Sequence, residues 1–475
     1  MAKLIRIHGW VLLAALLYVP AVQAQETESS SKNDPREHPV APIPAFLASG
    51  STSDSALNPT AEVQAAGDDR PLSGVQELTL GPSLGVRNFF LPSINATSQV
   101  ATSSSASGYG RPTALCYLLG TLDLNRVSER SELLLHYTGG GMMSTYLNSA
   151  IQDLEFTYTH KWRRWSLLIG DQISYLSESP FGFGGVGGLP FLNGGVSVPF
   201  LNPSLDPNQT IPTIIAPRLS NTVVSQIEYK LSPRASWTAS GSFGMLNFFG
   251  AGYINSTEGT LQTGYNYLLS PQSSVALIYH FNTFKYTYFP QGIEEHVVQL
   301  GYARYVTGRL SFHVAAGPSM AKLHGLLTGS ANRLSLAVDG ALGYQMDRTK
   351  FLVAYDHIVT GGSGVLFGAQ TSQLEASAEQ KLTPRWQGSA ALGYATNRGL
   401  IQTTTNLGNQ DFNSWYVAVR FSHQVRPGTS LFFSYGARLQ ATNVAGCAAP
   451  NCVTNSIGHE ISAGFNFGLQ PIAFR

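Results

Sequence analysis

Three pairs of neighbouring residues in this chain combine a carboxylate with an imidazole, the groups that most often perform acid–base chemistry. They are Glu295-His296, Asp356-His357 and His459-Glu460. Each pair lies in a run of alternating apolar and polar residues, and successive side chains of a β-strand point to opposite faces. Neither member of a pair can therefore hydrogen-bond the other as base and orienting acid. We expect no active site and interpret the protein as a non-enzyme.

Two glycine-rich segments have part of the pattern of other chemical sites. Gly361-Gly362-Ser363-Gly364 loosely resembles a nucleophile elbow, but it lies between two predicted strands instead of joining a strand to a helix. Gly139-Gly140-Gly141 lacks the helix and the lysine of a phosphate-binding loop. No group of Cys, His, Asp or Glu has the spacing of metal ligands. The sequence thus predicts no cofactor and no metal.

The stretch 220–248 shows the kind of element that carries these residues. Apolar side chains recur at every second position on both sides of the turn Ser232-Pro233-Arg234, and polar ones fall between them. This pattern predicts a β-hairpin with one apolar face, one polar face and strands of about ten residues. Tilted strands of that length cross a bilayer, and apolar-out, polar-in alternation is typical of a transmembrane barrel.

The same two-residue period recurs along the C-terminal three quarters of the chain. Short links alternate with longer links rich in Gly, Ser and Asn (322–332 among them), as expected for short periplasmic turns and longer outer loops. The predicted fold is all-β, a membrane-spanning antiparallel up-and-down barrel of about 18 strands. The predicted strands are 84–98, 112–124, 131–142, 150–161, 165–176, 220–231, 235–248, 258–269, 274–286, 295–306, 309–321, 333–345, 349–359, 372–382, 386–397, 412–424, 429–440 and 457–468.

Composition and the N-terminal segments limit the class of protein. Charged residues are 12% of the chain and the net charge is +1 without a Lys/Arg cluster, which argues against nucleic acid as a partner. Residues 1–24 have the basic, apolar and small-residue regions of a secretory signal peptide. Residues 25–70 are rich in Ser, Pro and Ala without periodicity, and we predict a disordered periplasmic arm. The barrel domain is predicted at 71–475.

The two faces of the predicted strands have different neighbours. Large apolar residues at one parity should face lipid, with Trp165, Trp237 and Trp386 in an aromatic girdle near the short links. Charged residues at the other parity should face a water-filled lumen, because a charge in hydrocarbon costs about 2–4 kcal/mol. Their mixed sign predicts weak ion selectivity, and the alternative is that they only solvate and cross-link the interior. These pore-lining candidates are Asp153, Glu155, Glu228, Lys230, Asp339, Asp356, Glu375, Glu379, Lys381, Arg420 and Arg438.

The signal sequence, alternating strands, short turns and long loops of residues 84–475 resemble bacterial outer-membrane β-barrels of the porin size class. The resemblance implies an outer-membrane location, lipid as a partner, and a channel that passes or exports hydrophilic solutes. The alternatives are a barrel that exports polysaccharide and a structural or adhesive barrel with a plugged lumen. Assembly into a homo-oligomer stays open. One departure is the end Ala473-Phe474-Arg475, since members commonly end on an aromatic residue that the insertion machinery reads.

The long segment 177–219 would be the third outer loop, which in porins folds inward and narrows the channel. Its apolar residues are too many for a loop freely exposed to water, and its constriction candidates are Phe181, Phe183, Phe191 and Phe200. Packing across the outer rim and contact with another subunit are the alternatives. In another outer segment, Cys447 and Cys452 are close enough in sequence to form a disulfide in an oxidising compartment.

Overall fold

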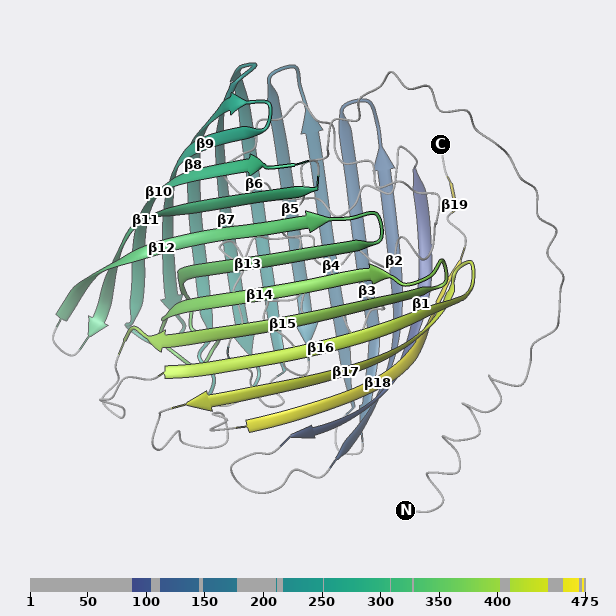
Figure 1. The fold of residues 1–475 in the computed structure, drawn as a ribbon. Helices are drawn as coiled ribbons and strands as arrows, with labels where there is room; N and C mark the ends of the chain where they lie inside the picture. Colours follow the sequence, from purple (N-terminus) through teal and green to yellow (C-terminus); the bar gives the residue numbers. More distant parts are fainter. Residues whose placement is uncertain are drawn as a thin grey trace, which may run out of the picture. The chain divides into compact units, whose positions relative to one another are not determined.

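The computed structural model describes residues 88–103, 112–144, 148–176, 211, 217–250, 252–307, 309–326, 329–401, 411–442, 456–469 and 472–473. In these ranges the chain forms strands β1 to β18 and a two-residue strand, β19 (Figure 1). Their bounds are β1 (Phe89–Ser103), β2 (Thr113–Val127), β3 (Ser131–Ser144), β4 (Asn148–Lys161), β5 (Trp165–Leu176), β6 (Arg218–Ser232), β7 (Ala235–Phe248), β8 (Ser256–Ser270), β9 (Ser273–Tyr286), β10 (Gly292–Tyr305), β11 (Leu310–Leu326), β12 (Gly329–Gln345), β13 (Thr349–Thr360), β14 (Ala369–Lys381), β15 (Trp386–Gly399), β16 (Asp411–Arg426), β17 (Thr429–Thr442), β18 (Ser456–Gly468) and β19 (Ile472–Ala473).

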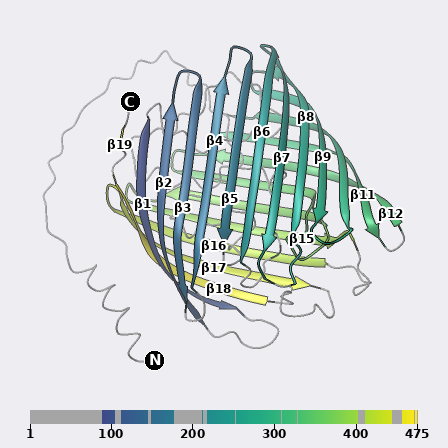
Figure 2. The same ribbon diagram turned by 180° about the vertical axis from the view of Figure 1, so that it is seen from behind.

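The sheet closes on itself. Each long strand pairs antiparallel with its neighbours in sequence, and β1 pairs with both β2 and β18, from Ser93↔Gly468 to Ser103↔Gly458. In Figures 1 and 2 the strands of one wall run across those of the other, as tilted strands of a closed barrel must. This confirms the predicted up-and-down barrel. Its first strand lies at 89–103, not at 84–98.

The predicted long link 322–332 is wrong. Strand β11 continues to Leu326, and strand β12 begins at Gly329. The two strands pair through Lys322↔Asn332 and Leu323↔Ala331. In this hairpin, polar residues such as Lys322 and Asn332 occupy outward positions of the strands. Nearer the middle of the barrel, the outward positions of the same strands are apolar. The polar residues interrupted the alternation from which the strand ends were predicted.

The barrel exterior is apolar. Large side chains at the outward parity are exposed, Leu334 to 79% and Leu300 to 68%. Aromatic rings gather near the short links, where Trp165 lies 4.3 Å from Tyr229 and Trp386 lies 4.4 Å from His423 between ring centroids. An apolar band with an aromatic girdle is the surface of an outer-membrane barrel. The described residues form a closed β-barrel of porin size with the exterior of a membrane-spanning barrel, as predicted.

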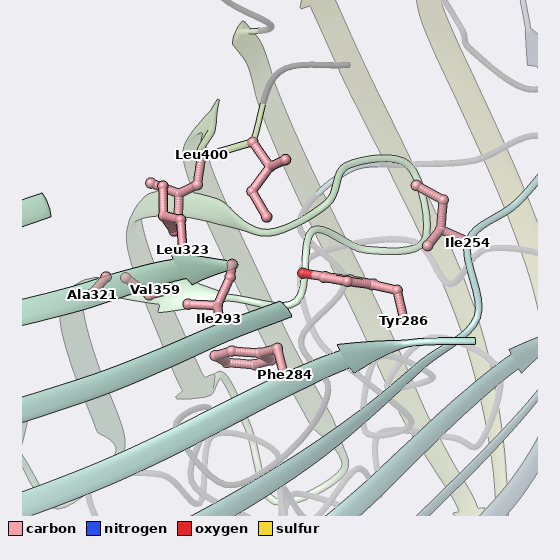
Figure 3. Packing of buried hydrophobic residues seen from close by; sticks show 9 residues of the cluster. Ile254, Phe284, Tyr286, Ile293, Ala321, Leu323, Val359 and Leu400 are labelled. Carbon is pink, nitrogen blue, oxygen red and sulfur yellow. The ribbon is translucent and has the colours of Figure 1, made fainter. Parts of the chain in front are cut away.

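Buried apolar side chains form a cluster inside the barrel, at the end of the strands that carry the longer links. Figure 3 shows Phe284 and Tyr286 of β9 and Ile293 of β10 beside Ile254 and Leu400, which come from two of these links. The cluster is completed by Ala321, Leu323, Val359 and Ile401, with Phe367 packed against it. This packing gives the interior different contents at its two ends.

Candidate functional site: the barrel interior

The inner face is identified by burial that alternates with exposure. On β4, Asp153 and Glu155 are 8% and 5% exposed, whereas Leu154 between them is 37% exposed. Every pore-lining candidate lies at the inward-facing positions of its strand, which alternate with the positions of the exposed apolar residues. The candidates lie on β4 (Asp153, Glu155), β6 (Glu228, Lys230), β12 (Asp339), β13 (Asp356), β14 (Glu375, Glu379, Lys381), β16 (Arg420) and β17 (Arg438).

A first carboxylate cluster lies on β2, β3 and β4. Register places Asp123 opposite His136, and His136 opposite Glu155. The His136 Nδ1 and an oxygen of Asp123 form a hydrogen bond, and Thr138 Oγ1 lies 3.1 Å from His136 Nε2. Among the described residues, one oxygen each of Asp153 and Glu155 has no hydrogen-bond partner. These oxygens can accept hydrogen bonds from water or coordinate a cation.

A second carboxylate cluster lies on β12, β13 and β14. Asp339 and Asp356 are direct cross-strand partners, and Asp356 also interacts electrostatically with Glu375 on the next strand. The Nε2 of Gln373 donates a 2.9 Å hydrogen bond to Glu375 Oε1. The Nε2 of His313 lies 3.5 Å from Asp339 Oδ1. Three carboxylates on adjacent strands thus share this part of the inner wall.

The two clusters face each other across the lumen. In the closed ring β12 is reached halfway round from β3 in either direction. Apart from Asp123, which lies toward the short-link end of β2, the carboxylates of both clusters lie near the middle of their strands. The described lysines at the inward parity lie elsewhere. Lys230, Lys350 and Lys381 are all at or near the strand ends joined by short links. The mid-strand cation Arg420 stacks its guanidinium 3.9 Å from the ring centroid of Phe432.

Segment 361–368, which joins β13 to β14, folds into the barrel at the long-link end. Its Gly364 oxygen accepts a 2.8 Å hydrogen bond from the Ile254 amide, and its Gly368 oxygen accepts one of 3.1 Å from the Leu400 amide. A Cβ on Gly364 would lie 2.1 Å from the ring of Phe248, and Gly364 has a φ of +73°. Glycine is required here by both the close approach and the left-handed backbone.

One residue of the predicted constriction loop is described within the barrel mouth. Ile211, between β5 and β6, is 1% exposed and packs with Leu366, Ala369 and Phe412. Ala369 begins β14 and Phe412 lies near the start of β16, and β14 is reached halfway round the ring from β5. Ile211 therefore reaches the wall opposite to its own strands. Phe181, Phe183, Phe191 and Phe200 lie outside the described residues.

Segment 361–368 and the partners Asp123 and His136 were not predicted as part of the interior site. The tripeptide Val365-Leu366-Phe367, apolar between glycines, is the signal that distinguishes this link from a solvated loop. Asp123 and His136 have the inward parity of their strands, which is the signal that identified the other candidates. The segments 1–24 and 25–70 and the cysteines Cys447 and Cys452 lie outside the described residues.

The acid–imidazole pairs separate onto two faces, as predicted. Asp356 faces inward, whereas His357 Nδ1 lies 2.6 Å from Ser372 Oγ on the other face. Glu295 accepts hydrogen bonds from Asn282 (2.9 Å) and Ser319 (2.5 Å), and its neighbour His296 contacts Tyr279 instead. Within the described ranges no three His, Cys, Asp or Glu side chains are placed to hold a metal ion.

No protein-family model and no curated protein matches this chain. Among solved structures it is similar to OpdQ of Pseudomonas aeruginosa (11% identity, covering 80% of this chain and 99% of that one, TM-score 0.43). It is also similar to P. aeruginosa OccK2 in complex with glucuronate (9%, 80% and 98%, 0.42) and to Acinetobacter baumannii OccAB4 (9%, 81% and 99%, 0.42). The strand register of the chain itself defines the closed barrel. In the described part of the chain, no helix is long and apolar enough to cross a membrane.

Proposed function

We propose that the protein is a passive channel for small hydrophilic solutes and that it prefers cations. One observation carries the proposal: carboxylates occupy the middle of two opposite inner walls, while the described lysines at the inward parity lie at the short-link end. A path between these walls passes the acidic groups from both sides. Fixed charges of one sign in a water-filled, low-dielectric enclosure concentrate the opposite ion.

The long-link end would set the size limit for solutes. Segment 361–368 and Ile211 come from different sides of the ring and pack together there through apolar side chains. A narrowed apolar mouth favours small solutes over a polysaccharide, which needs a wide path along its whole length. It also agrees with a plugged, non-transporting barrel, and conduction distinguishes the two.

The test is the ion current of the purified protein in planar bilayers under a KCl gradient. We expect discrete open steps and a reversal potential of the sign that cation preference gives. Asp339→Asn combined with Glu155→Gln should move the reversal potential toward zero. Glu379→Gln removes one carboxylate near the short-link end; it is the matched control for each single variant, Asp339→Asn and Glu155→Gln, and should move the reversal potential less than either. A protein without open steps is the plugged barrel, and equal shifts in all variants would refute the mid-lumen selectivity site.

A further inference from the structure

The short links form a basic rim. With the exception of Pro271-Gln272, every described short link contains an arginine or directly follows one. The links contribute Arg130, Arg164, Arg234, Arg309, Arg348 and Arg385, and Arg426 ends β16 just before the link 427–428. All of these arginines are exposed. Antiparallel strand order puts every short link at the same end of the barrel, so the arginines surround it.

Few carboxylates neutralise this rim. The acidic residues of the described short links are Glu129 and Asp347. Asp347 pairs with Arg309 at 3.3 Å, and both side chains of this pair are largely exposed. The chain as a whole has a net charge of only +1. The positive charge at this end is therefore a local concentration that is balanced by acidic groups elsewhere in the chain.

The rim lies at the level of the aromatic girdle. Trp162 and Trp165 border Arg163 and Arg164 directly, Trp237 lies three residues after Arg234, and Trp386 follows Arg385. These tryptophans are 40–50% exposed on the outside of the barrel. Exposed Trp marks the boundary between hydrocarbon and headgroups. The guanidinium groups therefore lie at headgroup depth, where long basic side chains extend toward the polar layer.

We propose that the rim arginines bind the anionic headgroups of glycerophospholipids in the leaflet at the short-link end. Guanidinium groups pair with phosphate in bidentate geometry, and basic residues at a membrane surface attract anionic lipid. The distribution of the arginines identifies the occupant. A protein or a polymer would bind one sector of the rim, whereas a ring of lipids contacts the whole circumference, as the arginines do.

The test uses the protein's own tryptophans. In a Trp10→Phe, Trp415→Phe protein, the four remaining tryptophans all lie at the rim. The protein is reconstituted into phosphatidylcholine vesicles that contain brominated phosphatidylglycerol or the same fraction of brominated phosphatidylcholine. We expect quenching to show an enrichment of phosphatidylglycerol of about two- to five-fold around the rim. In high salt the enrichment should fall, because the Debye length shrinks to about 3 Å at 1 M.

The decisive variant combines Arg164→Gln, Arg234→Gln, Arg348→Gln and Arg385→Gln. Its enrichment should fall to about one. The matched control is Lys285→Gln, Lys322→Gln, Arg333→Gln and Arg398→Gln, which removes the same charge from exposed positions at the long-link end and should keep the enrichment.

Equal quenching by the two lipids in the unmodified protein overturns the proposal. A second result would also overturn it: the unmodified protein sediments with isolated peptidoglycan, and the rim variant no longer does so although its lipid enrichment is unchanged. Heat-modifiable gel migration checks that each variant is folded, and the salt series on the unmodified protein tests the proposal without any variant.

Discussion

The Ile254 amide donates a 2.8 Å hydrogen bond to the Gly364 oxygen, which joins the link after β7 to the link after β13 across the barrel mouth. The two links belong to strands that are not neighbours in the ring. Phe248 lies against Gly364 and stacks on Tyr253 at 4.7 Å between ring centroids. The backbone of segment 361–368 is thus held on both of its sides, so its position in the mouth is a property of the fold.

Replacing Gly364 should open the mouth. In Gly364→Val the new Cβ meets the Phe248 ring at 2.1 Å, and φ stays in the left-handed region that a β-branched residue avoids. The loop must then leave its place, and single-channel conductance should rise. Gly241→Ala is the control, since its Cβ would make only ordinary contacts, the nearest at 3.7 Å. Unchanged conductance in Gly364→Val would show that the loop does not limit the path.

Ile211 and Leu366 should act as a pair. Each is buried in the same small cluster, so Ile211→Ala and Leu366→Ala each remove packing worth about 2–5 kcal/mol. Because one partner's loss already loosens the contact, we expect the double variant to raise conductance by less than the sum of the single effects. Additive effects in bilayer recordings would mean that the two residues limit the current independently.

The mid-strand arginine should oppose the carboxylates. Arg420→Gln removes a positive charge from the inner wall and should raise the permeability ratio of K⁺ to Cl⁻. Lys381→Gln removes the same charge at the last residue of β14 and should raise the ratio less. Reversal potentials in a KCl gradient measure both. A larger effect at Lys381 would move the selective region to the short-link end.

The loss of stability caused by a charge on the barrel exterior should depend on how deep in the membrane the charge lies. Leu300 is exposed on β10 at the outward parity, and Leu300→Lys places an ammonium group in hydrocarbon at a cost of about 2–4 kcal/mol near the midplane. Thr307→Lys, in the link after β10, should be nearly neutral. Unfolding by urea in lipid vesicles measures the difference. Equal stability of the two variants would contradict the assignment of this face to lipid.

Sequence periodicity predicted the strands and their faces because each strand reports its own environment locally. Leu154 between Asp153 and Glu155 is enough to assign β4, whatever its neighbours are. It could not predict that His136 contacts Asp123, because that contact depends on the register of β2 against β3. Nor could it predict that Ile211 reaches β14, because a contact across the ring depends on closure. The extent of the β11–β12 hairpin around Lys322 was predicted wrongly for a third reason: its outward positions hold polar residues instead of apolar ones.

The central claim is that the mid-strand carboxylates line a path open to ions. The most direct test is Asp339→Cys in a Cys116→Ser background, treated with a cationic methanethiosulfonate reagent during single-channel recording. Cys116 is at the parity of exposed Leu118 and is replaced to leave one target among the described residues. We predict an immediate drop in cation current on addition of the reagent, and its recovery with a reducing agent. A current that does not change although the cysteine has been modified would contradict the claim.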